Sequence, residues 1–141
     1  MTDSFYNEIL IDHNLHPVHL HELPCATCSN AGMNPTCGDQ LTLHLNIENG
    51  VITDGAYTGV GCAISQASTD IMLDLVIGKT PAEAKRIKEL FSKMISGDIS
   101  EEELEELEEA GALQNISKMP ARVKCALLGW NTLDKLLDEN M

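Results

Sequence analysis

An alternating run at positions 40–58 constrains the fold more than any other part of this 141-residue chain. Its first half has apolar residues at every second position: Leu41, Leu43, Leu45 and Ile47. Because successive side chains of a β-strand point to opposite faces, this spacing predicts a strand with one buried face. Asn49 and Gly50 then supply the two residues that tolerate positive φ in a tight hairpin turn. The sequence therefore predicts an antiparallel hairpin whose second strand follows at 51–58.

Most of the remaining chain has the spacing or the capping residues of helices. We expect helices at 4–14, 63–77, 80–95 and 100–111, and a last helix from about residue 120. Thr80 and Ser100 each precede a glutamate by three residues, which is typical of a capped helix start. Residues 13–38 show no sustained period and are expected to form a loop. These elements predict an α+β fold, a single domain over residues 1–141 with a small antiparallel β-sheet of about three strands packed against several helices.

The charges are distributed unevenly. The chain has 9 Lys and Arg against 22 Asp and Glu, a net charge of −13, and every basic residue follows position 78. This sign excludes binding to a phosphate backbone through basic side chains, so we expect no nucleic-acid partner. Asp98 and seven glutamates between 98 and 110 carry −8 of the total. This acidic segment is either a solvated helix face or a docking surface for a partner.

The sequence lacks the patterns of a membrane or secreted protein. No apolar run approaches the roughly 20 residues that a membrane-spanning helix needs. The first residues have neither the positive charge nor the apolar stretch of a secretory signal. We therefore expect a cytoplasmic protein with no membrane partner, in which five cysteines indicate metal or redox chemistry rather than a set of disulfides.

Three cysteines occur where the local sequence favours a reactive thiol. Cys37 precedes Gly-Asp39 in a turn before the first strand. Cys62 follows a glycine-rich bend at a helix start, and Cys125 lies in the first turns of the last helix. Helix N-termini stabilise thiolates, the form that binds metal and attacks sulfur. With Asp39 these thiols supply four donors for a zinc site or an iron–sulfur cluster, whereas a buried small side chain is the common fate of a single cysteine.

The region before the hairpin contains further cysteines and histidines. Cys25 and Cys28 have the spacing of a metal or redox pair, but no second such pair occurs and no βαβ pattern surrounds them, so we expect accessory thiols. Four histidines crowd the same stretch: His13, His16, His19 and His21. Their spacing fits no single helix face, so we expect solvated loop histidines. His44 alternates with the apolar residues of the first strand and should point outward.

Three ordered cysteine motifs make the chain recognisable. They are Asn34-Pro-Thr-Cys37-Gly-Asp39, Gly59-Val-Gly-Cys62-Ala-Ile-Ser65-Gln-Ala-Ser68 and Arg122-Val-Lys-Cys125-Ala-Leu-Leu. Together they resemble the IscU/SufU-type iron–sulfur cluster assembly family, which is also the family of the NifU N-terminal domain. Residues 6–13 resemble that family's opening helix, so the resemblance covers nearly the whole chain. It implies that Cys37, Asp39, Cys62 and Cys125 are the ligands of a metal ion or cluster.

Two departures from the IscU pattern indicate the SufU subtype. Lys124 stands where IscU-type scaffolds carry a histidine, and residues 118–122 replace the chaperone-binding motif of those scaffolds. The acidic segment, within a predicted insertion at about 97–118, looks like the insertion typical of SufU.

By this resemblance the chain is a zinc-binding sulfur acceptor that takes persulfide sulfur from a SufS-like cysteine desulfurase and serves downstream iron–sulfur assembly proteins. It is at most a zinc-dependent sulfurtransferase. Cys37 is the expected sulfur acceptor because its turn is the most mobile of the three settings, and Cys125 is the second choice. Two alternatives remain. The same four ligands could hold a transient [2Fe–2S] cluster on a scaffold, or the domain could be a structural zinc module that binds a partner.

Overall fold

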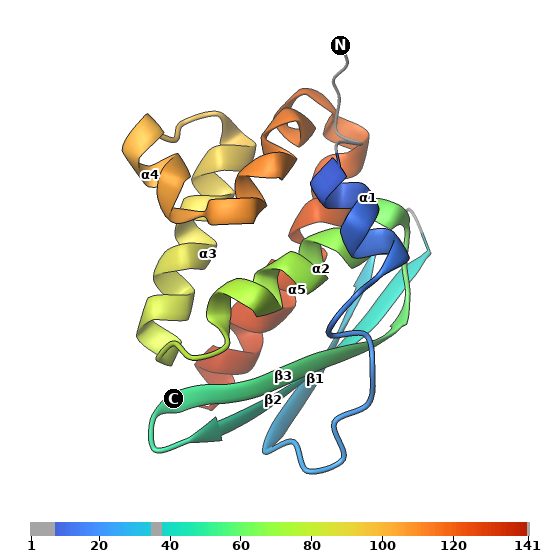
Figure 1. Ribbon diagram of the computed structural model, residues 1–141, viewed down its shortest axis with the longest axis vertical. Coiled ribbons are helices and arrows are strands. Elements are labelled where there is room, and N and C mark those ends of the chain that lie inside the picture. Colours follow the sequence, from blue (N-terminus) through green and yellow to red (C-terminus); the bar gives the residue numbers. More distant parts are fainter. Residues whose placement is uncertain (1–7, 35–37, 141) are drawn as a thin grey trace.

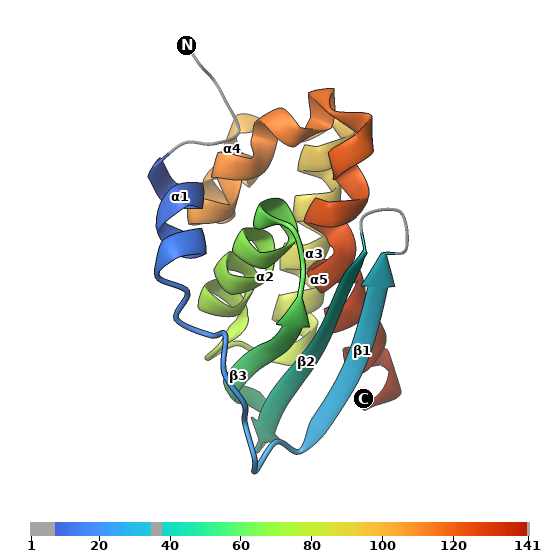
Figure 2. The same ribbon diagram turned by 90° about the vertical axis from the view of Figure 1, so that its right-hand side faces the viewer.

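The computed structural model describes residues 8–34 and 38–140, which form a three-stranded antiparallel sheet with helices packed on one of its faces (Figures 1 and 2). The strands lie in the order β1-β2-β3. In chain order the elements are α1 (Glu8–Leu15), β1 (Cys28–Asn34), β2 (Asp39–Glu48), β3 (Val51–Val60), α2 (Ala63–Val76), α3 (Pro81–Ser96), α4 (Glu101–Glu106), the 3₁₀ helix η1 (Glu108–Lys118) and α5 (Pro120–Glu139). The predicted α+β fold is confirmed.

The hairpin has the predicted form. The alternating leucines of β2 are buried, and both turn residues have positive φ, 53° at Asn49 and 76° at Gly50. The two capping boxes are also present, because the Thr80 and Ser100 hydroxyls each accept a hydrogen bond from the backbone amide three residues later. Local sequence signals therefore place the hairpin and two helix starts correctly.

The prediction of a loop across 13–38 is wrong for residues 28–34. These residues form β1, which pairs with β2 from Cys28 opposite Leu45 to Asn34 opposite Asp39. An edge strand of small and polar residues shows no apolar alternation in its sequence. Residues 28–34 are a strand because they pair with β2. Gly32 also lies against α5, where an added Cβ would come within 2.0 Å of the Thr132 hydroxyl oxygen. A larger residue would push the last helix away from the sheet.

The acidic segment differs from its prediction as a single helix to about residue 111. α4 ends at Glu106, and the chain continues as the 3₁₀ helix η1. The break coincides with Glu108, whose φ of 48° is left-handed and does not continue an α-helix. The first predicted helix, at 4–14, is described only from Glu8 onward and ends at Leu15, so the first four positions of the prediction lie outside the described residues.

The core lies between the sheet and the helices α2 and α5. α5 packs on β1 and β2, α2 packs on β3, and α3 covers the far side of α5. Trp130 is fully buried at the centre and stacks on Phe91 with ring centroids 4.4 Å apart. Among the described residues, no helix is long and apolar enough to cross a membrane.

A candidate metal centre at one end of the sheet

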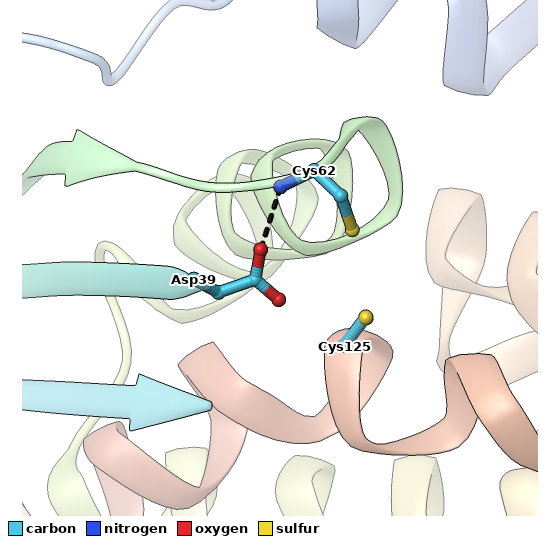
Figure 3. Close-up of side chains that lie close together, drawn as sticks. All are labelled: Asp39, Cys62 and Cys125. Carbon is cyan, nitrogen blue, oxygen red and sulfur yellow. Dashed lines mark hydrogen bonds between the residues drawn. The ribbon is translucent and has the colours of Figure 1, made fainter. Parts of the chain in front are cut away.

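Asp39, Cys62 and Cys125 come together where three elements meet (Figure 3). Asp39 begins β2, Cys62 directly precedes α2, and Cys125 lies on α5. One carboxylate oxygen and the two sulfur atoms all lie within 4.8 Å of one another. Asp39 and Cys125 are buried, whereas Cys62 is half-buried. The side chains point toward a common space between the sheet end and the two helices.

Cys62 is placed by Gly59, near the end of β3, and by Gly61, just after it. Gly59 has a φ of 113°, and an added Cβ would lie 2.1 Å from the backbone oxygen of Gln40. At Gly61 a Cβ would lie 2.4 Å from the Ser65 hydroxyl oxygen and 3.5 Å from Asp39 Oδ1. These contacts leave no space for side chains where the chain turns from the sheet into α2. The predicted bend at this point is therefore present.

The Cys62 thiol sits at the start of a helix. Its Sγ accepts a hydrogen bond from the Ser65 amide at 3.5 Å, so a sulfur atom caps α2. The N-terminal end of a helix carries partial positive charge and favours a negatively charged group. This position suits a thiolate that binds a metal ion.

Asn34 is a site residue to which no role was assigned from the sequence. Its buried Nδ2 donates to Asp39 Oδ2 at 3.4 Å and to Cys125 Sγ at 3.7 Å. The amide therefore links the carboxylate to the buried thiol and limits how far either can rotate. The only signal for it in the sequence is its place at the start of the first cysteine motif.

The donors that meet here fit zinc. Tetrahedral zinc takes thiolate and carboxylate ligands, and two sulfurs at ~2.3 Å from the ion lie about 3.8 Å apart. The separation among the three ligand atoms is compatible with this geometry. Cys37, the fourth predicted ligand, lies outside the described residues, so the ligand assignment as a whole stays a prediction.

The two accessory thiols and the Lys124 side chain lie elsewhere. Cys25 is exposed and Cys28 is half-buried at the far end of β1, where its thiol donates to the Leu45 carbonyl at 3.9 Å. Cys28 is thus at the opposite end of the strand from Asn34. Lys124 is exposed while its neighbour Cys125 is buried, because adjacent residues of a helix face different directions.

The expectation of solvated loop histidines is wrong for two of the four. His13 lies on α1 and is buried, and its ring is within hydrogen-bond distance of both Asp70 and Glu109. Burial lowers the pKa of His13, but the bonds to these two carboxylates outweigh it and raise the pKa above its usual value. His19 pairs with Asp74, whereas His16 and His21 are exposed as expected.

His44 lies on the sheet face away from the buried leucines, as expected. It is within hydrogen-bond distance of the Ser29 hydroxyl at 2.8 Å and of the Thr58 hydroxyl at 3.1 Å. These contacts link the three strands across the outer face.

Known proteins share both the sequence and the fold. Residues 5–135 match the family model of the NifU-like N terminal domain. The chain is 37% identical over 135 residues to a Streptococcus pyogenes serotype M1 protein named iron–sulfur cluster assembly scaffold protein IscU, covering 96% of this chain and 84% of that one. It is 34% identical over 133 residues to the zinc-dependent sulfurtransferase SufU of Bacillus subtilis (strain 168), covering 94% and 89%.

A solved structure agrees with these matches. A protein of Fervidobacterium islandicum AW-1, described as a putative iron–sulfur cluster assembly scaffold protein for the SUF system, superposes with a TM-score of 0.88. It is 34% identical and the match covers 94% of this chain and 96% of that one. The family match, the two named relatives and the shared fold lead to one conclusion. This chain belongs to the NifU-like N-terminal domain family, the iron–sulfur cluster assembly family that includes IscU and SufU.

Proposed function

We propose that this protein is a zinc-binding sulfur acceptor that takes persulfide sulfur from a cysteine desulfurase during iron–sulfur cluster assembly. The observation that carries the proposal is the convergence of Asp39, Cys62 and Cys125 at the end of the sheet. The name of the B. subtilis relative, a zinc-dependent sulfurtransferase, supports the same assignment.

The proposed zinc ligands are Cys37, Asp39, Cys62 and Cys125. When bound, zinc would keep the cysteines deprotonated and protected from oxidation. Cys37 precedes Asp39 by two residues, and two residues of chain span at most about 7 Å, so connectivity allows its thiol to reach the other three donors. Asn34 and the Cys62 amide hold the two oxygens of the Asp39 carboxylate in place.

Sulfur transfer needs a thiolate that a partner can reach. The acceptor thiolate attacks the terminal sulfur of the desulfurase persulfide, forming a new S–S bond as the bond to the enzyme sulfur breaks. The enzyme cysteine leaves as a thiolate, and the transferred sulfur is now a persulfide on the acceptor. Cys125 has no exposed surface, which disfavours it as the attacking residue. Cys37, in the predicted turn before Asp39, is the proposed acceptor, and Cys125 is the second choice.

A SufS-like desulfurase is the proposed partner, with iron–sulfur assembly proteins downstream. Lys124 and the acidic segment support the SufU subtype, because they are the positions where the sequence departs from the IscU pattern. The acidic side chains of this segment are exposed except for the half-buried Glu103, and the segment is proposed to be a family-specific insertion.

A scaffold for a [2Fe–2S] cluster is the second candidate function. The S. pyogenes relative is named a scaffold protein, and three thiolates with one carboxylate are also a donor set for such a cluster. In this reading the cluster is cargo, held by the same four residues before it passes to an acceptor protein.

Sulfur loading of single variants tests the acceptor assignment. Cys37→Ser, Cys125→Ser and the control Cys25→Ser are incubated with a cysteine desulfurase and ³⁵S-labelled cysteine, and label bound to each protein is measured after gel filtration. We expect Cys37→Ser to lose nearly all label and Cys25→Ser to load like the natural protein. Full loading of Cys37→Ser overturns the assignment.

Metal and cluster content separate the candidate functions. The protein is purified without oxygen, and its zinc, iron and acid-labile sulfide are measured beside its stimulation of the desulfurase. One zinc per chain with stimulation supports the sulfur acceptor. A labile cluster that passes to an apo-protein supports the scaffold, and zinc with neither activity supports a structural zinc module.

A further inference from the structure

A second cluster of metal-ligating side chains lies beside η1, away from the thiols. Within the described part of the chain it joins His13 of α1, Asp74 of α2 and Glu109 of η1, each with one ligand atom within 4.8 Å of the others. Asp74 follows Cys62 by twelve residues, which is about 18 Å along a helix at ~1.5 Å per residue. Figures 1 and 2 show α1 beside both α2 and the orange segment that contains η1.

A buried carboxylate holds the His13 ring in one orientation. Asp70 has no exposed surface, and its Oδ2 lies 2.6 Å from His13 Nδ1. Oδ1 of the same carboxylate accepts a hydrogen bond from the His19 amide at 2.8 Å, so Asp70 is itself held in place. Histidines that bind metal ions commonly donate their second ring N–H to such a carboxylate. Asp70 leaves His13 Nε2 as the nitrogen that faces the other two residues.

The remaining groups converge on that nitrogen. Glu109 Oε1 lies 2.9 Å from His13 Nε2, and Asp74 Oδ2 lies 4.0 Å from it. His19 Nε2 lies 2.8 Å from Asp74 Oδ1, so a second imidazole orients the Asp74 carboxylate. The three carboxylates of Asp70, Asp74 and Glu109 have ion pairs only with these two histidines among the described residues.

The surface is hollowed at this position. A pocket of ≈ 290 Å³ is lined by Ile71, Asp74, Leu75, Glu108 and Glu109. Glu108 and Glu109 add negative charge at its rim, and both are exposed. An ion bound here would keep open positions for water, because two of its protein ligands are at the surface.

We propose that His13 Nε2 and the carboxylates of Asp74 and Glu109 bind a divalent first-row transition-metal ion. One imidazole and two carboxylates form a nitrogen and oxygen donor set that suits Mn²⁺, Fe²⁺ or Zn²⁺ and contains no soft sulfur ligand. On binding, any proton on Nε2 leaves to solvent, while Nδ1–H continues to donate to Asp70. His19 acts as a positioning residue through Asp74.

The ion would connect three elements that are distant in sequence. His13 and Glu109 are 96 residues apart, and Glu109 belongs to the segment proposed as an insertion. A bound ion therefore fixes η1 against α1 and α2. This site does not depend on the proposed sulfur transfer.

Mn²⁺ is the probe that separates this site from the thiols, because it prefers oxygen ligands and binds thiolates weakly. The full chain, loaded with a single equivalent of zinc and freed of excess, is titrated with Mn²⁺, and free Mn²⁺ is measured by its EPR signal. We expect one Mn²⁺ per chain, displaced by added Zn²⁺. Glu109→Gln and Asp74→Asn should each weaken binding by at least about tenfold, in the range seen when groups around a metal are removed.

Two controls and two outcomes complete the test. Glu105→Gln removes the same charge from an exposed position on α4, and Cys25→Ser removes an exposed thiol that is not among the proposed zinc ligands; both should bind Mn²⁺ like the natural chain. Glu109 and Asp74 are exposed enough for the variants to fold, which circular dichroism verifies. The proposal is overturned if the natural chain binds no Mn²⁺, or if both cluster variants bind it with unchanged affinity.

Discussion

The Asp39 carboxylate accepts a hydrogen bond from the backbone amide of Cys62 at 2.7 Å, although the two residues are 23 positions apart. This bond joins the start of β2 to the start of α2. A residue predicted as a metal ligand therefore also holds the backbone of a second predicted ligand. The two roles of Asp39 can be separated by experiment.

Asp39→Ala should lower both stability and zinc affinity, whereas Asp39→Asn should lower mainly zinc affinity. Alanine leaves the half-buried Cys62 amide without its acceptor, which costs up to about 1–3 kcal/mol. Asparagine keeps one oxygen for that amide but removes the charge that would face the ion. Urea unfolding in the presence of a metal chelator measures the change in stability. Competition with a zinc chelator measures the change in zinc affinity.

Asp98→Asn is the matched control, because Asp98 is exposed on the surface. This variant should have the stability and the zinc affinity of the natural protein. Zinc affinity of Asp39→Asn equal to that of the control would argue that Asp39 is not a ligand.

Asn34→Ala should weaken zinc binding by about tenfold, the lower end of the range for a residue that orients ligands. The amide links Asp39 Oδ2 and Cys125 Sγ, so its removal lets both ligands move. Asn131→Ala, at an exposed position on α5, is the control. Chelator competition compares the two variants, and equal affinities would show that Asn34 does not order the site.

Gly59→Ala should destabilise the protein far more than Gly50→Ala. Both glycines have positive φ, which costs alanine at least about 1 kcal/mol at each position. At Gly50 a Cβ meets nothing within 4 Å, but at Gly59 it lies 2.1 Å from a backbone oxygen of the neighbouring strand. Thermal unfolding of the two variants measures the difference, and similar melting temperatures would contradict it.

Cys28 should react with iodoacetamide more slowly than Cys25 at every pH between about 7 and 9. Burial raises the pKa of the Cys28 thiol, outweighing a hydrogen bond with Thr27 that lowers it. Since the thiolate is the reactive form, the raised pKa lowers the fraction of Cys28 that can react until the pH rises above that pKa. Cys25 is exposed. Mass spectrometry of the alkylated peptides reports both rates, and a Cys28 rate equal to that of Cys25 across this range would contradict the prediction.

Local signals account for the elements that were predicted correctly. The hairpin follows from the leucine spacing and from Asn49-Gly50, and the starts of α3 and α4 follow from hydroxyl caps three residues before a glutamate. In each case the interacting groups are close in sequence. Such signals need no knowledge of the rest of the chain.

β1 and the His13 cluster could not be found in this way. β1 is a strand because β2 offers its edge and because Gly32 allows α5 to approach, and neither condition is visible within residues 28–34. His13 faces carboxylates 57 and 96 residues away in the sequence. Its neighbours along the chain indicate only a histidine-rich stretch.

The amino-acid sequence was enough to define the family, the α+β class and the donor types of the thiol motifs, because these depend on residue identity and short spacing. Packing of β2, α2 and α5 brings Asp39, Cys62 and Cys125 within 4.8 Å and places Asn34 among them. Packing of α1 and η1 on α2 likewise creates the second cluster. Distances between residues far apart in sequence are set by how buried apolar faces fit together, and that fit exists only in the folded chain.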